Sequence, residues 1–259
     1  MLQELYAGAA QEAAARELEI PLSVLERIAS LAAAPLNPRK YLLSPTNVRV
    51  IAEIKRASPS RGVMAKIDDP GSLASIYQDA GAGAVSVLTE SKGFLGSLED
   101  LDRVRSSVQI PVLRKDFISN EYQVIEARAH GADMVLLIVA GLDRKVLAQL
   151  KLYIEELGMT ALVETHSKDE VRIACDIGAD LIGINTRDLN TFETDRSLFG
   201  ELATLIPKGS IRVAESSVRD VIDVQDYASN GADCVLVGEA LVTGNAADLI
   251  SSFNEVLKP

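Results

Sequence analysis

The sequence predicts a protein of the α/β class, a single (β/α)8 TIM barrel with an N-terminal helical extension. A glycine-led phrase recurs four times, each time ending an amphipathic stretch and opening an apolar run: GAGAVSVL, GADMVLLI, GADLIGIN and GADCVLVG, from Gly81, Gly131, Gly178 and Gly231. Because glycine adopts the positive φ at which many helices end, each phrase is typical of a helix that turns directly into a strand. The copies stand about 50 residues apart, about twice the length of one βα unit, so each gap has room for a further strand.

Composition is the second observation that favours a barrel. Of the 259 residues, 47% are hydrophobic but only 4% are aromatic, and there is no Trp. The interior must therefore be built from Ala, Val, Ile and Leu, which suit strands that are buried on both faces. The length fits one large α/β domain.

The apolar runs and the stretches between them predict the elements in order. Strands are expected at 48–54, 84–89, 110–115, 133–139, 159–164, 180–185, 211–215 and 234–238. Helices are expected at about 70–80, 98–106, 120–130, 143–157, 168–177, 198–206, 218–229 and 246–257. Eight strands that alternate with eight helices favour a closed parallel barrel. A doubly wound open sheet is the alternative, but it would normally carry a glycine-rich phosphate loop after its first strand, and the sequence has none there.

The segment before the first strand has a different pattern. Residues 1–47 contain two helical stretches, at about 2–18 and 22–33, followed by the Pro-rich segment PLNPRKYLLSP. We interpret residues 1–47 as an extension that packs on the catalytic barrel domain of residues 48–259.

Charge and targeting signals limit the partners of the protein. The net charge of −11 argues against nucleic acid or an anionic membrane as a partner, because both require a basic surface. The N-terminus lacks the pattern of a signal or transit peptide, and no apolar run reaches the roughly 18 residues of a membrane span. Cys175 and Cys234 lack metal-like spacing and are interpreted as buried free thiols. A cytoplasmic protein is expected, and a monomer or weak homo-oligomer.

Polar side chains end five of the eight expected strands. They are Glu53 and Lys55, Lys115, Glu164, Asn185 with Arg187, and Glu215 with Ser216. In a barrel the C-terminal ends of the strands meet at one mouth, which holds the active site. Several carboxylates close to lysines can tune each other's pKa, an arrangement that suits proton transfer. We expect burial to raise the pKa of Glu164 and a nearby cation to lower the pKa of Lys115.

Two further groups of residues bear on phosphate and metal binding. Barrels often hold phosphate after strands seven and eight, here at Ser216, Ser217, Gly238 and Glu239. Ser58 and Ser60, after the first strand, are further hydroxyl donors, whereas Gly238 taken alone is better explained by a tight turn. His130 and His166 have no second ligand at metal spacing, so no metal is expected.

Taken together, these stretches resemble the indole-3-glycerol-phosphate synthase family. The similar stretches are VIAEIKRASPSRG, SVLTE followed by FLGS, VLRKDFI, GADMVLLIVA, LVETH, IGINTRDL, VAESS and VLVGEAL. The resemblance runs over nearly the whole chain and includes the helical extension, with LERIAS at 25–30. It implies ring closure of 1-(2-carboxyphenylamino)-1-deoxyribulose 5-phosphate to indole-3-glycerol phosphate, with loss of carbon dioxide and water, in tryptophan biosynthesis. It also implies that no cofactor is required.

The resemblance further implies roles for the catalytic residues. Lys115 would be the general acid that polarises the ribulose carbonyl, and Glu164 would be the general base. Lys55 would pair with the anthranilate carboxylate and serve in the dehydration, with Glu53 beside it. The remaining polar residues of the mouth would orient these groups or line the pocket: Asn185, Arg187, Glu215 and Ser216.

The same resemblance implies the substrate-binding residues. Phe94, Phe117 and Leu136 would form the apolar wall for the anthranilate ring. The phosphate would rest on Ser58, on backbone amides near Ser217, and on Gly238 and Glu239. Ser217 departs from the family pattern, in which glycine often follows AES. Glu239 would repel the phosphate unless its carboxylate points away and only its N–H contributes.

Three other functions compete with this interpretation. A Schiff-base aldolase would use Lys115 or Lys55 as an amine nucleophile. A phosphoribosylanthranilate isomerase would need a Cys and Asp pair at strand ends, but Cys175 lies in an expected helix and Cys234 opens its strand. A non-catalytic barrel that binds a phosphorylated metabolite is expected to lack one of the strand-end ionisable residues, and Lys55, Lys115 and Glu164 are all present.

Overall fold

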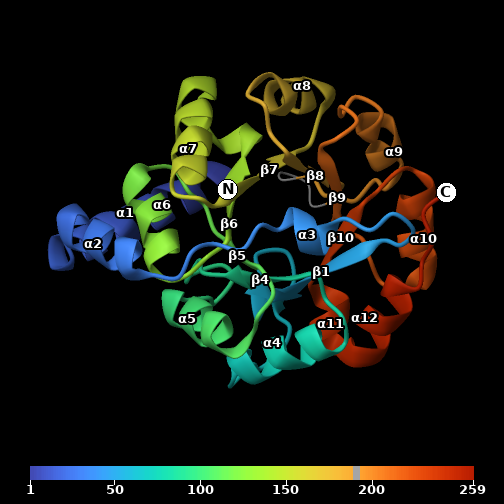
Figure 1. The fold of residues 1–259 in the computed structure, drawn as a ribbon, viewed down its shortest axis with the longest axis horizontal. Coiled ribbons are helices and arrows are strands. Elements are labelled where there is room, and N and C mark those ends of the chain that lie inside the picture. Colours follow the sequence, from blue (N-terminus) through green and yellow to red (C-terminus); the bar gives the residue numbers. More distant parts are fainter. Residues whose placement is uncertain (189–192) are drawn as a thin grey trace.

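Eight parallel strands close into a barrel in the computed structural model, which describes residues 1–188 and 193–259 (Figure 1). In spatial order around the barrel the strands are β1, β10, β9, β8, β7, β6, β5 and β4. Their bounds are β1 (Arg49–Ile54), β4 (Ala84–Leu88), β5 (Val112–Lys115), β6 (Met134–Ile138), β7 (Thr160–Thr165), β8 (Leu181–Asn185), β9 (Ile211–Glu215) and β10 (Cys234–Val237). The predicted (β/α)8 barrel is therefore confirmed, and the open sheet is excluded.

A helix follows each strand and packs against the outside of the barrel. These helices are α4 (Pro70–Asp79), α5 (Leu98–Ser107), α6 (Glu121–Ala129), α7 (Arg144–Glu156), α8 (Lys168–Asp176), α9 (Ser197–Ala203), α10 (Val221–Ser229) and α12 (Ala246–Asn254). Several begin at a polar N-cap, as Ser97, Asn120 and Asp220 show for α5, α6 and α10. Glycines at positive φ follow α4, α6, α8 and α10, as the recurring glycine phrase predicts.

Five short elements were not predicted from the sequence. A hairpin of β2 (Ala57–Ser58) and β3 (Gly62–Val63) forms in the loop after β1, and α11 (Glu239–Thr243) lies between β10 and α12. The segment before β1 contains α3 (Arg39–Leu42), and a 3-10 turn, η1 (Val139–Gly141), follows β6. Elements of two to five residues are too short to show a hydrophobic period.

The N-terminal segment contacts both ends of the barrel. Helices α1 (Leu2–Glu19) and α2 (Leu22–Leu31) lie beside α6, while α3 lies across the middle of the barrel in this view (Figure 1). Arg16 of α1 donates to the buried Glu126 of α6 at 2.5 and 2.9 Å. At the strand N-terminal ends, the Sγ of Cys234 donates to the carbonyl of Leu42 at 3.1 Å.

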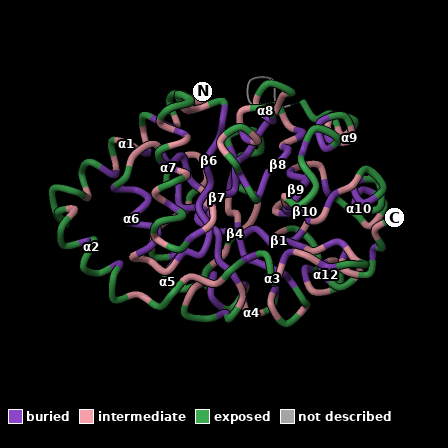
Figure 2. The backbone as a smooth tube through the Cα atoms, turned by 45° about the horizontal axis from the view of Figure 1, so that its top comes forward, coloured by how far each residue is buried: buried purple, intermediate pink, exposed green. Residues whose placement is uncertain are grey.

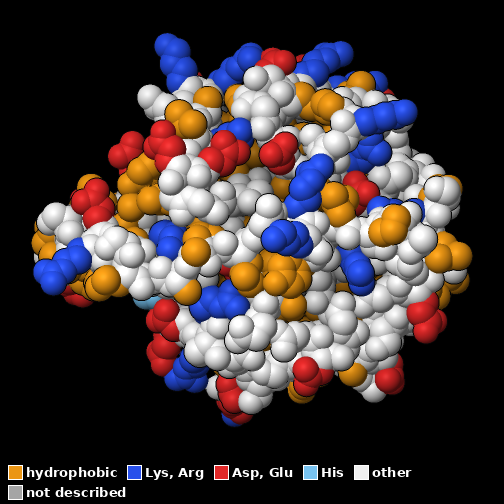
Figure 3. Space-filling view, in the orientation of Figure 1, with side chains coloured by type: hydrophobic (Ala, Val, Ile, Leu, Met, Phe, Trp, Pro, Cys, Tyr) orange, Lys and Arg blue, Asp and Glu red, His pale blue; other side chains and the backbone are white. Residues whose placement is uncertain are grey.

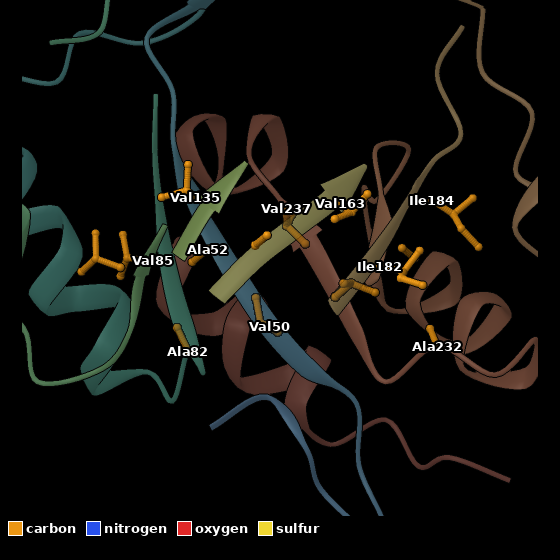
Figure 4. Packing of buried hydrophobic residues seen from close by; sticks show 14 of the residues in the cluster. Val50, Ala52, Ala82, Val85, Val135, Val163, Ile182, Ile184, Ala232 and Val237 are labelled. Carbon is orange, nitrogen blue, oxygen red and sulfur yellow. The ribbon is translucent and has the colours of Figure 1, made fainter. Parts of the chain in front are cut away.

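Alternate residues of each strand face opposite sides of the barrel wall. Outward residues such as Val50, Ala52 and Val237 join the helices in one large buried cluster, part of which Figure 4 shows. Inward residues form a second cluster inside the barrel. The strands are accordingly buried along their length, whereas the helices alternate between buried and exposed residues (Figure 2).

The barrel interior is layered. One layer consists of apolar residues from alternate strands: Ile51 on β1, Leu113 on β5, Leu162 on β7 and Val213 on β9. Two residues further along each of these strands come Glu53, Lys115, Glu164 and Glu215. The same packing rule that builds an apolar core therefore brings four ionisable side chains into one layer near the C-terminal mouth.

The outer surface has a mixed charge. Lys and Arg side chains lie between Asp and Glu and apolar side chains on the face shown in Figure 3. Within the described parts of the chain, no helix combines the length and apolar character that crossing a membrane would require.

Candidate active site

A layer of one ammonium and three carboxylates forms the floor of the barrel mouth. Lys115 Nζ lies 3.3 Å from Glu215 Oε2, 3.6 Å from Glu164 Oε2 and 3.7 Å from Glu53 Oε2. All three carboxylates are buried. We refer to these four residues as the charged layer.

The charged layer changes the proton affinity of its members. Burial alone lowers the pKa of Lys115, but the charges of Glu215, Glu53 and Glu164 outweigh burial and raise that pKa above its ordinary value. The expectation that a nearby cation lowers the pKa of Lys115 is therefore wrong. Carboxylates are its close neighbours, and they favour the charged ammonium.

The two carboxyls nearest to Lys115, those of Glu164 and Glu215, have pKa values shifted in opposite directions. Burial raises the pKa of Glu164 by itself, but the charges of Lys115 and His166 hold that pKa well below its usual range. The expectation of a raised pKa for Glu164 is thus also wrong. Burial and the neighbouring charge of Glu164 raise the pKa of Glu215 to about 8. The layer therefore favours a charged Lys115 and an ionised Glu164, and it shifts Glu215 toward the protonated form.

Two glycines leave space for these carboxylates. A Cβ at Gly183, in the middle of β8, would lie 2.0 Å from Glu215 Oε1, and a Cβ at Gly238 would lie 2.6 Å from Glu53 Oε1. Gly183 faces the barrel interior, and the Glu215 carboxylate occupies the space that a side chain at position 183 would fill. Gly238 has a φ of −117°, which other residues also adopt, so the close approach of the Glu53 carboxylate is what favours glycine at this position.

Lys55 and an aromatic wall lie beside the charged layer. Lys55 Nζ is 3.5 Å from Glu53 Oε1 and 5.7 Å from the centroid of the Phe94 ring. The Phe94 and Phe117 rings lie 6.1 Å apart, and Leu136 lines the same cavity. An ammonium at the edge of an apolar wall suits a ligand that joins an aromatic ring to a carboxylate.

The loop that carries Phe94 is held by Glu90, a residue that sequence reasoning missed. The buried Glu90 carboxylate accepts backbone N–H groups of Lys92, Gly93 and Phe94 at 3.0, 2.7 and 2.9 Å. Its position directly after an apolar strand, in SVLTE, was the available signal.

A hydrogen-bond chain connects Glu164 to the end of β9. Asn185 Nδ2 donates to Glu164 Oε1 at 3.2 Å, and Asn185 Oδ1 accepts from Ser216 Oγ at 2.7 Å and from the backbone N–H of Arg187 at 3.1 Å. On the other side, His166 Nε2 lies 3.3 Å from Glu164 Oε1. The sequence interpretation gave His166 little weight because no second ligand stands at metal spacing from it.

The residues predicted to bind phosphate gather at one side of the mouth. Ser216 and Ser217 have φ of 71° and 60°, the left-handed region in which residues other than glycine are uncommon. The Ser217 hydroxyl accepts from Thr186 Oγ1 at 3.3 Å. The Glu239 carboxylate forms an exposed ion pair with Arg61 of the β2–β3 hairpin, a neighbour that the sequence interpretation did not consider.

All of the site residues that the sequence predicts line one cavity of about 900 Å³ at the C-terminal ends of the strands. They are Glu53, Lys55, Ser58, Phe94, Lys115, Phe117, Leu136, Glu164, Asn185, Arg187, Glu215, Ser216, Ser217, Gly238 and Glu239. Met1, Leu2 and Leu5 of the N-terminal segment also line it. Within residues 1–188 and 193–259, no group of three or more His, Cys, Asp or Glu side chains is arranged to hold a metal ion.

The fold and this cavity define a class of protein: a (β/α)8-barrel enzyme with a buried acid–base centre at its C-terminal mouth. The family model described as indole-3-glycerol phosphate synthase matches residues 2–253. The chain belongs to the indole-3-glycerol phosphate synthase family. The predicted function and enzyme class are thereby confirmed, a carbon–carbon lyase that forms indole-3-glycerol phosphate in tryptophan biosynthesis.

Similar proteins agree with this assignment. The indole-3-glycerol phosphate synthase of Leifsonia xyli subsp. xyli is 54% identical, over 99% of this chain and 98% of the relative. Those of Parafrankia sp. and Mycolicibacterium smegmatis are 53% and 52% identical, each over 97% of this chain and over 95% and 94% of the relative. The three competing functions are set aside on this ground.

Solved structures with low sequence identity share the fold. Thiamine phosphate pyrophosphorylase from Pyrococcus furiosus superposes with a TM-score of 0.62 at 13% identity, covering 85% of this chain and 97% of that one. The N-acetylmannosamine-6-phosphate 2-epimerase from Clostridium perfringens gives 0.59 at 15% identity, covering 76% and 88%. These two likenesses concern the barrel alone.

Proposed function

We propose that the charged layer carries out both proton-transfer stages of indole ring formation, with Lys115 as the acid and Glu164 as the base. The observation that carries this proposal is the contact of Lys115 Nζ with three buried carboxylates on the cavity floor. These charges keep the ammonium protonated, so that it is ready to give a proton to a substrate oxygen above it.

Ring closure is the first stage. The ring carbon that bears the carboxylate bonds to the ribulose carbonyl carbon, and the carbonyl π electrons move to the oxygen. Lys115 supplies the proton that this oxygen takes up. Carbon dioxide then leaves, and the electrons of the broken carbon–carbon bond restore the aromatic ring.

Dehydration is the second stage. The new hydroxyl group leaves as water after taking up a proton, and a proton leaves the neighbouring carbon that is bonded to nitrogen. Glu164, ionised at neutral pH, receives that second proton. Lys55 and the protonated Glu215 are the donors available for the departing hydroxyl. Each step moves only protons and electron pairs of the substrate, so the proposed chemistry uses no cofactor.

Substrate binding uses the two sides of the cavity. Lys55, with Glu53 beside it, pairs with the anthranilate carboxylate, while Phe94, Phe117 and Leu136 cover the ring. The phosphate lies at Ser58, Ser217, Gly238 and Glu239, and Asn185, Arg187 and Ser216 orient the centre of the substrate. The ion pair of Glu239 with Arg61 supports this placement because it puts a cation beside the carboxylate that would otherwise repel phosphate.

The expected setting of the enzyme follows from the same features. We propose that it works in the cytoplasm as a monomer or weak homo-oligomer, with residues 1–47 as an extension of the catalytic barrel of residues 48–259. The support is that one chain supplies every wall of the cavity described above. Purified protein mixed with the carboxyphenylamino substrate should develop indole-like fluorescence, and a protein that develops none under saturating substrate would contradict the proposed reaction.

A further inference from the structure

His166 lies between two carboxylates just behind the proposed base. It follows Glu164 by two residues at the end of β7, and its ring is largely buried. His166 Nε2 is 3.3 Å from Glu164 Oε1, and His166 Nδ1 is 3.3 Å from Glu170 Oε2 on α8. The Nε2 contact is close but makes no aligned hydrogen bond, so it acts chiefly through charge.

The start of α8 fixes this arrangement. Ser167 is the N-cap, and its Oγ accepts the backbone N–H of Glu170 at 3.3 Å. The Glu170 carboxylate in turn accepts the backbone N–H of His166 at 2.8 Å. One carboxylate therefore holds both the backbone and the ring of His166, an arrangement that favours the doubly protonated imidazolium.

A second cation beside Glu164 matters because the first one changes its charge during the proposed reaction. When Lys115 gives its proton to the ribulose oxygen, Glu164 loses the ammonium that holds its pKa low, before its own step. Asn185 also contacts Glu164 but carries no charge.

We propose that His166 is a positioning residue for Glu164: clamped by Glu170, it stays an imidazolium and keeps Glu164 ionised and in place after Lys115 has given up its proton. This inference rests on the proposed role of Glu164 as the base. Burial lowers the pKa of His166 by itself, but Glu164 and Glu170 outweigh burial and raise it to about 10, which agrees with a permanent cation at neutral pH.

The test compares His166→Gln with His130→Gln. Glutamine keeps a neutral N–H donor but removes the charge, and His130, which pairs with Asp102 away from the cavity, is the matched control. The acidic limb of the kcat–pH profile should move up by about one pH unit in His166→Gln, a tenfold loss of rate at a given pH on that limb. His130→Gln should leave the limb unmoved.

A second variant keeps the test valid if His166→Gln fails to fold. Glu170→Gln keeps an oxygen that accepts the His166 backbone N–H and removes only the charge, so it should move the limb in the same direction by less. The protein has 2 histidines, so their ring proton signals can be assigned by NMR with the two Gln variants. The His166 titration midpoint should fall in Glu170→Gln while that of His130 stays the same.

The outcomes separate this inference from the proposed function. If Glu164→Gln keeps full activity, the base assignment fails, whatever His166 does. If Glu164→Gln is inactive but the acidic limb does not move in His166→Gln or Glu170→Gln, His166 serves only the structure of the α8 start and the inference is wrong. A His166 ring that titrates near the ordinary value of histidine would also overturn it.

Discussion

Lys115, Glu164, Glu215 and Glu53 occupy positions where a barrel normally packs branched apolar side chains. Two residues earlier on the same strands the interior is apolar, so the change from core to site takes place within one layer. Three carboxylates around one ammonium are costly to bury, and neither oxygen of Glu215 has an aligned hydrogen-bond partner among the described residues. The protein is therefore less stable than it would be with apolar residues in this layer, but the layer supplies side chains with shifted pKa values.

Glu215→Gln should stabilise the protein, and more so as the pH rises. The folded-state pKa of Glu215 is about 8, above the unfolded value, so the folded carboxyl retains a proton that the unfolded chain loses. Wild-type stability is then lost as the pH rises from about 5 to about 8, whereas glutamine does not titrate. We expect Glu215→Gln to be more stable by about 4 kcal/mol at pH 8, with much less difference at pH 5. Urea unfolding at both pH values measures this, and an equal difference at the two would refute it.

Lys55→Ala tests the proposed pairing with the substrate carboxylate. Loss of a charge-assisted contact should raise KM about tenfold or more and should also lower kcat, because Lys55 is a proposed donor in dehydration. Steady-state kinetics against Lys66→Ala gives the comparison, since Lys66 is an exposed lysine of the same loop that pairs with Asp68. A Lys55→Ala enzyme with the KM of the Lys66→Ala control would show that the carboxylate binds elsewhere.

At the scale of elements, strand β8 has a glycine at the position where a side chain would collide with a carboxylate of the neighbouring strand. Gly183 lies between the apolar Leu181 and the polar Asn185 on the inward face, and the carboxylate of Glu215 on the adjacent β9 fills the space beside it. The sequence phrase GADLIGIN predicted the strand, but nothing in it showed that this second glycine is a packing requirement. That fact depends on the register between β8 and β9.

Gly183→Ala should therefore damage both folding and catalysis. Its Cβ would overlap Glu215 Oε1, so Glu215 must leave the charged layer or the strands must separate. We expect a loss of about 2–4 kcal/mol in unfolding free energy and a large fall in kcat. Gly8→Ala is the control, because Gly8 lies on helix α1 and, within the described part of the chain, its added Cβ would meet only Lys92 Nζ, at 3.7 Å, so alanine there should be neutral or stabilising. If both substitutions had the same small effect, the packing account of Gly183 would be wrong.

At the scale of the whole molecule, the sequence could predict the features that depend on the hydrophobic period and on the order of the elements along the chain. Apolar runs, glycine-ended helices and strict alternation give the bounds of the eight strands within two residues and those of their helices within three. Barrel closure then brings the strand ends together, which is why residues as distant as Glu53 and Glu215 could be assigned to one cavity. The hairpin of β2 and β3 and the short α11 are beyond such reasoning because two to five residues are too few to show a repeated hydrophobic period.

The sequence could not predict which side chains lie within about 4 Å of each charged group. The pKa directions expected for Glu164 and Lys115 were wrong for this reason, because burial could be inferred but its opposing charges could not. The contacts of His166 with Glu164 and of Arg61 with Glu239 likewise join loops and helices whose side-chain directions no spacing rule supplies.

The most direct test of the account is the turnover of Lys115→Gln, measured by indole fluorescence at saturating substrate and at several pH values. If Lys115 is the acid in ring closure, kcat should fall by about 10²–10⁴-fold while KM changes by much less. Lys151→Gln, which removes a lysine paired with Glu155 on the outer helix α7, should keep the wild-type kcat. A Lys115→Gln enzyme that keeps near-normal kcat and loses only affinity would contradict the account and make Lys55 the better candidate for the acid.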